Sequence, residues 1–146
     1  MAVAKGRQFW KGTSAEDLAE YLAAFSAARE EPVAEVVPLA CAGCGGRTFR
    51  LEVDDDEGFA RRSCTGCGVT HVMLDSGEFE DDAEPGEAAC PCGGEEFELT
   101  AGFATRLDGE VRWVFVAGRC VSDGTLGVFT DWSIDYSPSR HLLTSA

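Results

Sequence analysis

The fold of this chain is decided by the stretch Cys41-Ala-Gly-Cys44-Gly-Gly and by a second stretch, Cys64-Thr-Gly-Cys67-Gly. Each is a C-x-x-C-G turn, and 19 residues separate Cys44 from Cys64. The two-residue gap lets both sulfurs of a turn face one ion, and the glycine after the second cysteine can adopt the backbone angles of a tight turn. Two such turns supply four thiolates, a set that suits a tetrahedral structural zinc site. The sequence therefore predicts one closed metal site made of Cys41, Cys44, Cys64 and Cys67.

The residues around these turns predict antiparallel strands. Arg47–Val53 and Phe59–Ser63 have the composition of two hairpin arms with the acidic tip Asp54–Gly58 between them, and Val69–Leu74 supplies a further strand. Each C-x-x-C-G turn has the form of a zinc knuckle. With two knuckles on one ion and three antiparallel strands, residues 38–77 resemble the zinc ribbon family. The resemblance implies that the four cysteines are the ligands. Rubredoxins share the two knuckles and hold iron, so the spacing leaves the metal open, and we expect zinc.

The same pattern occurs a second time along the chain. Cys44-Gly-Gly-Arg-Thr-Phe-Arg-Leu51 aligns with Cys92-Gly-Gly-Glu-Glu-Phe-Glu-Leu99 at an offset of 48. An offset of 56 aligns Cys64, Gly68, Val72 and Asp75 with Cys120, Gly124, Val128 and Asp131. The offsets differ because the second copy has a longer hairpin, Phe97–Thr105 and Glu110–Val116, with Asp108-Gly109 as its turn. The chain is therefore predicted to be a tandem repeat of zinc-ribbon-like modules.

The second copy departs from the first at two places. Its first knuckle is shortened to Cys90-Pro-Cys92, and Asp123 stands where the first copy has Cys67. A carboxylate oxygen can ligate zinc, so Cys90, Cys92, Cys120 and Asp123 form a chemically reasonable second site, weaker than four thiolates. Alternatively, this site holds no metal and its three cysteines are small buried hydrophobes. The sequence leaves both alternatives open.

The N-terminal segment, residues 1–37, predicts one helix that begins near Thr13. Thr13 and Glu16 match a capping box, and Pro32 ends the helical pattern. An apolar stripe at three- and four-residue steps needs a surface to pack on, with Phe9 and Trp10 near its start; the stripe consists of Leu18, Tyr21, Leu22 and Phe25.

Charge divides the rest of the chain. Residues 78–89 carry six acids and no base, together with Pro85 and Gly86, which predicts a solvated acidic linker. The predicted organisation is thus a helical segment (1–37), a zinc ribbon module (38–77), the linker (78–89) and a second, degenerate module with a tail (90–146). The fold class is mainly β, a small α+β protein. In the second module Val111–Ala117 is apolar on both faces, so its sheet is expected to be covered by the helix, the first module or another chain.

The net charge restricts the partners. Asp and Glu number 26 against 12 Lys and Arg, giving a net charge of −14. Such a surface repels phosphate backbones and anionic lipid, so nucleic acid and membranes are disfavoured. No apolar run is long enough to cross a membrane, and the N-terminus lacks the apolar core of a secretion signal. Seven cysteines in a short chain fit a reducing compartment in which thiols bind metal, so we expect a cytoplasmic protein.

No catalytic motif accompanies the cysteines. The sequence has no triad motif, phosphate loop or H-E-x-x-H helix, and neither His71 nor His141 has a nucleophile motif beside it. We therefore expect a non-enzymatic zinc-binding protein that acts as a protein–protein interaction module, an accessory or inhibitory partner of a protein with a basic surface. One alternative is a nucleic-acid-binding zinc ribbon, whose footing would be Arg47, Arg50, Arg61 and Arg62. A second alternative is a rubredoxin-like iron electron carrier.

Overall fold

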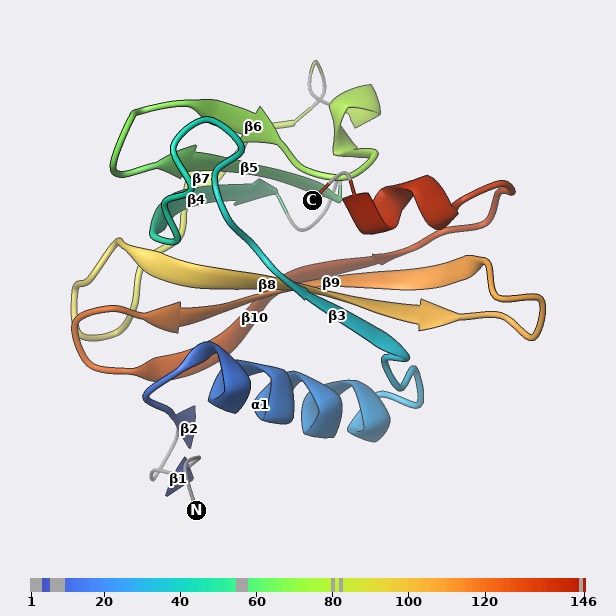
Figure 1. Cartoon of the computed structure of the whole chain (residues 1–146), viewed down its shortest axis with the longest axis horizontal. Coiled ribbons are helices and arrows are strands. Elements are labelled where there is room, and N and C mark those ends of the chain that lie inside the picture. The colour runs from blue at the N-terminus through green and yellow to red at the C-terminus, as the bar shows by residue number, and fades with distance from the viewer. Residues whose placement is uncertain (1–3, 6–9, 55–57, 80, 82, 145) are drawn as a thin grey trace.

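The computed structural model describes residues 4–5, 10–54, 58–79, 81, 83–144 and 146. These form one antiparallel sheet, one α-helix and two short 3-10 helices (Figure 1), so the predicted mainly β, small α+β fold class is confirmed. The elements in chain order are β1 (Ala4–Lys5), β2 (Trp10–Lys11), α1 (Ala15–Ala28), β3 (Glu35–Pro38), β4 (Phe49–Asp54), β5 (Phe59–Cys64), β6 (Thr70–Val72), η1 (Ser76–Phe79), β7 (Gly86–Glu87), β8 (Phe97–Thr105), β9 (Val111–Cys120), β10 (Thr125–Ser133) and η2 (Arg140–Thr144).

The helix begins one residue later than the capping box predicts. Ser14 is the N-cap, and its hydroxyl accepts a hydrogen bond from the Asp17 main-chain N–H at 3.4 Å. The Asp17 carboxylate in turn accepts from both the N–H and the hydroxyl of Thr13. Asp17 therefore takes the place predicted for Glu16, because it is Asp17 that follows the actual cap by three residues. Of the other predicted features, Phe9 and residues 55–57 of the hairpin tip lie outside the described residues, as do Glu80 and Asp82 of the acidic run.

The sheet runs in the order β1-β2-β10-β9-β8-β4-β5-β6, and the six strands from β10 to β6 consist of two equivalent halves. In the first half Phe49 pairs with Cys64 and Arg61 with Val72. In the second half the residues at the repeat offsets form the same pairs, Phe97 with Cys120 and Ala117 with Val128. Residues at the two predicted offsets thus have the same strand register in both halves.

The two halves meet at equivalent residues. Strands β4 and β8 pair antiparallel at Phe49 and Phe97, which occupy the same position in the two copies. An antiparallel pair of equivalent residues places a local two-fold axis between them. Phe49 is fully buried and Phe97 is 1% exposed, so this axis passes through the core.

Each half also donates the strand that precedes its first knuckle to the other half. Strand β3 precedes the first knuckle of the first copy, yet it pairs with β8, and Leu39 N–H donates to the Leu99 carbonyl at 3.0 Å. Strand β7 precedes the first knuckle of the second copy and pairs with β4, and Ala88 N–H donates to the Leu51 carbonyl at 2.8 Å. The exchange is reciprocal. It also places residues 86–88, from the acidic segment 78–89, against the first module.

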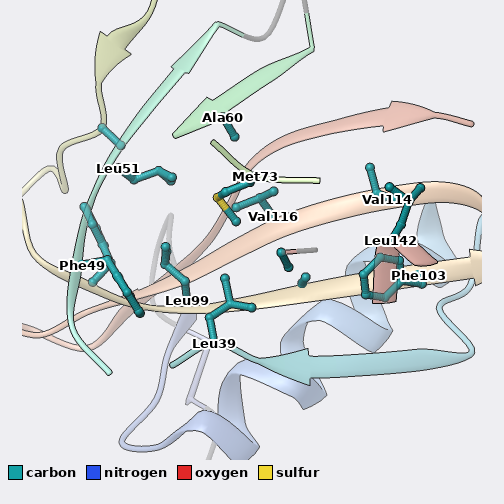
Figure 2. Close-up of a cluster of buried hydrophobic side chains, with 14 of the residues drawn as sticks. Leu39, Phe49, Leu51, Ala60, Met73, Leu99, Phe103, Val114, Val116 and Leu142 are labelled. Atoms are coloured by element: carbon teal, nitrogen blue, oxygen red, sulfur yellow. The ribbon is translucent and has the colours of Figure 1, made fainter. Parts of the chain in front are cut away.

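Side chains from both halves form one core. Figure 2 shows Leu51, Ala60 and Met73 of the first half beside Leu99 and Val116 of the second, all from one buried cluster. Helix α1 lies on the opposite face of the β8-β9-β10 sheet (Figure 1), where Leu18 and Leu22 pack in a second cluster that includes Phe115, Ala117 and Leu126. The helix therefore covers one apolar face of β9 and the first module covers the other. Both are among the covering elements expected from the sequence.

Replacing the ring at the axis tests whether the halves behave as one unit. We expect Phe49→Ala to lower the free energy of unfolding by about 3–5 kcal/mol, because a fully buried aromatic ring leaves a cavity. Urea unfolding should remain a single transition, and amide exchange in β9 should accelerate along with that in β4. Leu107→Ala, in a fully exposed turn, is the control and should change stability by less than about 0.5 kcal/mol. Two separate unfolding transitions would contradict the single core.

Candidate metal centres

The four cysteines of the first module converge on one point. They come from two turns, the loop before β4 and the loop after β5, and their sulfurs all lie within 4.8 Å of one another. Cys41 Sγ is 3.6 Å from Cys67 Sγ, and Cys44 Sγ is 3.5 Å from Cys64 Sγ. These distances exclude disulfides, whose sulfurs lie about 2.05 Å apart. They match a tetrahedral zinc site, because four sulfurs at about 2.3 Å from one ion are about 3.8 Å from each other.

Main-chain amides of the knuckles favour the ionised form of these sulfurs. The pKa of the Cys41 thiol is lowered to about 6, chiefly because the amides of Cys44 and Gly43 donate to it. The pKa of Cys64 is also lowered, chiefly by the amides of Cys67 and Gly66. The turns thus stabilise the thiolates of Cys41 and Cys64, the form that binds metal. At Cys44 the Gly46 amide acts in the same direction, but side-chain hydrogen bonds with Cys64 and Cys67 raise the pKa of that thiol to about 12. Gly45 and Gly68, the glycines after the second cysteines, have φ of 75° and 79°, as the tight-turn argument requires.

The second module brings together the four residues that the sequence identifies as candidate ligands. Cys90, Cys92, Cys120 and Asp123 each place one donor atom within 4.8 Å of the others. Cys92 Sγ is 3.6 Å from Cys120 Sγ, and Cys90 Sγ is 3.4 Å from Asp123 Oδ1. The shortened knuckle therefore still directs both of its sulfurs to the cluster. The hydrogen bonds from Gly68 N–H to Cys64 O and from Gly124 N–H to Cys120 O show that the second knuckles have the same turn.

Asp123 is held as a carboxylate. Its pKa lies well below its ordinary value, chiefly because the Thr125 main-chain N–H donates to Oδ1 at 2.9 Å. Its other oxygen, Oδ2, lies 3.4 Å from Lys11 Nζ. The oxygen within reach of the sulfurs is thus oriented by one main-chain bond, and the second oxygen by a lysine. This is the arrangement expected of a ligating carboxylate with an outer partner.

Both clusters fit zinc by donor type and spacing. Each offers four donors, S₄ in the first module and S₃O in the second, and both sets suit a tetrahedral ion. The backbone beside each set leaves no room for a side chain. A Cβ at Gly46 would lie 3.1 Å from Cys64 Sγ, and a Cβ at the equivalent Gly94 would lie 2.9 Å from Cys120 Sγ. The glycines that follow the first knuckles are therefore part of both candidate sites.

A buried arginine, Arg62, lies beside the first cluster, as Lys11 lies beside the second. Arg62 is 8% exposed, lies over the Phe49 ring at 4.7 Å and donates through Nε and Nη2 to the Ala146 main-chain oxygen. Burial lowers the pKa of Arg62, while the charges of Cys41 and Cys64 raise it. From the sequence, Arg62 is expected only as part of a nucleic-acid footing. The alternation of side chains along β5 indicates the position of Arg62 beside the cluster, because Arg62 is two residues before Cys64 and therefore lies on the same buried face.

Lys11 was missed for a different reason. It is 112 positions from Asp123 and belongs to the two-residue strand β2, which pairs with the start of β10. A strand this short leaves no periodicity in the sequence, so only the fold places Lys11 at the second cluster.

The four arginines named as a nucleic-acid footing do not form an unpaired patch. Arg50 lies 3.2 Å from Glu87 and 3.7 Å from Glu95, Arg61 makes two hydrogen bonds to Glu52, and Arg62 is buried. Only Arg47 is both exposed and without an ion pair in the described part of the chain. His71 and His141, the two histidines, belong to neither donor cluster.

Comparison of the chain with protein-family models, curated proteins and solved structures gives no match. The resemblance to zinc ribbons therefore rests on the two cysteine clusters and the strands that carry them. No helix in the described residues is long and apolar enough to span a membrane.

Gly46→Ala tests the fit of the first cluster. We expect it to weaken Zn²⁺ binding there by at least about tenfold, because the new methyl group would press on Cys64 Sγ and distort the donor set. Gly43→Ala is a matched control in the same knuckle, since its Cβ would lie 3.7 Å from the nearest sulfur, an ordinary contact. The measurement is competition with a chromogenic chelator. Equal affinities for the two variants would contradict a metal held at this point.

Proposed function

We propose that this chain is a non-enzymatic zinc protein whose two structural zinc ions stabilise a rigid β body, and that this body binds another protein through its acidic surface. The observation that carries the proposal is the pair of four-donor clusters. Four protein donors complete a tetrahedral shell, so neither ion would have a position left for substrate. Zinc bound in such a shell contributes folding free energy to a small protein rather than reaction chemistry.

The distribution of charge supports a protein partner with a basic surface. Seven basic side chains in the described residues form ion pairs within the chain; these are Lys11, Arg29, Arg50, Arg61, Arg112, Arg119 and Arg140. Arg62 and Arg106 donate to main-chain carbonyls instead. Because acids outnumber bases by 14, this internal pairing leaves the excess negative charge on the surface. That surface attracts cationic protein and repels nucleic acid.

Elemental analysis of the purified protein tests the zinc sites. We expect two zinc ions per chain, and Asp123→Ala should retain one after dialysis, because three thiolates alone leave the second site incomplete. Asp135→Ala removes an exposed carboxylate remote from both clusters and should retain two. Adding a strong chelator should lower the thermal unfolding temperature of the wild type. Iron in place of zinc would support the rubredoxin-like alternative, and protein without metal at full stability would refute the proposal.

Titration with DNA tests the partner class. Single- and double-stranded oligonucleotides should not bind at 50 mM salt, because Arg50 and Arg61 are already paired with carboxylates and Arg62 is buried, which leaves Arg47 as the one exposed, unpaired arginine of the four. Fluorescence anisotropy is a sufficient measurement. Binding at low salt that weakens at 200 mM salt would be the signature of phosphate contact and would favour the nucleic-acid-binding alternative.

A further inference from the structure

The two-fold repeat leaves one edge of the sheet unmatched. Strand β10 of the second module and β6 of the first are equivalent, and each lies at the outer end of its half. β10 is covered by β2, with Thr125 paired to Lys11 and Leu126 to Trp10. Within the described residues β6 pairs only with β5, and it forms the opposite margin of the sheet (Figure 1). Among the described residues, the first module therefore has no counterpart of the strand β2 that covers the second module.

Burial at equivalent positions shows the same difference. Leu126, whose main chain pairs with β2 and whose side chain packs in the cluster with Leu18 and Leu22 of α1, is 3% exposed, whereas its counterpart Thr70 is exposed. A Cβ at Gly124 would lie 2.6 Å from the Gly12 carbonyl oxygen, whereas a Cβ at the equivalent Gly68 would meet no described atom within 4 Å. The space that the chain itself fills beside the second knuckle of one module is open beside the second knuckle of the other.

The main chain of β6 can pair with another strand. Val69 accepts from Cys64 and Met73 donates to Ala60, each at 2.9 Å, so alternate residues 69, 71 and 73 face β5. The N–H and C=O groups of Thr70 and Val72 therefore point away from β5. Beside this edge lies a hollow of about 420 Å³, mostly apolar, between residues 69–71 and residues 37–42. The equivalent hollow of the second module, beside residues 125–127, is about 150 Å³.

We propose that the edge of β6 binds an extended segment of a partner protein, which adds an antiparallel strand as β2 does on β10. The inference rests on the proposed function, whose interaction surface it locates. The added strand would place its side chains over the hollow beside β6 and its main chain against Thr70 and Val72. This is β-strand addition, in which main-chain bonds supply affinity and the adjoining hollow supplies selectivity.

The same comparison specifies a basic residue in the partner. On β10 the added strand brings Lys11 to 3.4 Å from Asp123, and the counterpart of Asp123 is the exposed Cys67. A lysine or arginine in the added strand would therefore face an exposed sulfur of the first cluster, which carries net negative charge as four thiolates on one zinc ion. Two copies of this chain, each with a net charge of −14, repel one another, so we assign the edge to a different, basic partner rather than to a second copy.

The test is a titration of the zinc-loaded, ¹⁵N-labelled full chain with a synthetic peptide of residues 8–13, the segment that contains β2. We expect amide shifts confined to residues 68–72 and neighbouring β5. In the peptide, Lys11→Glu should weaken binding by at least about threefold, because it reverses the charge that faces Cys67. Shifts at residues 124–127 instead, or no shifts at millimolar peptide, would overturn the inference.

Protein variants provide the matched controls. Thr70→Pro removes one outward N–H and leaves the hydrogen bonds between β6 and β5 in place, so it should weaken peptide binding by about tenfold. Thr70→Ala keeps that N–H and should change the peptide affinity by less than about twofold. Val72→Pro removes the second outward N–H and replaces Thr70→Pro if that variant is unstable. Sedimentation analysis shows whether β6 pairs with a second copy of the chain. A dimer that dissociates in the Thr70→Pro variant would refute the assignment of this edge to a different protein. The zinc content of the same sample distinguishes failure of this inference from failure of the proposed function. Two zinc ions per chain with no peptide binding would refute only this inference.

Discussion

Hydrogen bonds from Leu39 to Leu99 and from Ala88 to Leu51 carry the chain from each half of the molecule into the other, and the remaining structure depends on that exchange. A β module of about 40 residues has too small a core to be stable without help. Here each half supplies the other with a strand and with half of a shared core. The exchanged strands also lead directly into the first knuckles, so the positions of Cys41 and Cys90 depend on the strands of the opposite half. Any metal bound at one cluster therefore stabilises the whole body.

Electrostatics in the two centres follow from the same arrangement. Four thiolates, or three thiolates and a carboxylate, exceed the charge of one zinc ion by two, and this excess lies partly buried. The first cluster has Arg62 beside it, on the buried face of β5. The residue equivalent to Arg62 in the second half is Gly118, so the second cluster obtains its cation from β2 instead, as Lys11. Each cluster thus has one cation of the chain near it, on β5 in the first half and on β2 in the second.

Local patterns in the sequence predict much of this molecule, and long-range pairing accounts for what they miss. The spacing of Cys41, Cys44, Cys64 and Cys67 predicts which donors converge, because both sulfurs of a knuckle are fixed by one turn. The alignment of Asp123 with Cys67 similarly predicts the fourth member of the second cluster. The exchange of β3 and β7 could not be predicted, since Glu35–Pro38 and Gly86–Glu87 are short strands whose partners lie far along the chain.

Differences between equivalent residues explain why only one half is closed by the chain itself. Ala117 of β9 is fully buried beneath α1, and its counterpart on β5 is Arg61, which pairs with Glu52 across the surface of the sheet. A helix cannot pack on that ion pair without removing it from water, so α1 covers the second half alone. The position of α1 in turn places β2, three residues before the helix cap, beside β10. The first half consequently has a charged outer face, and its margin strand β6 is left uncovered by the described residues.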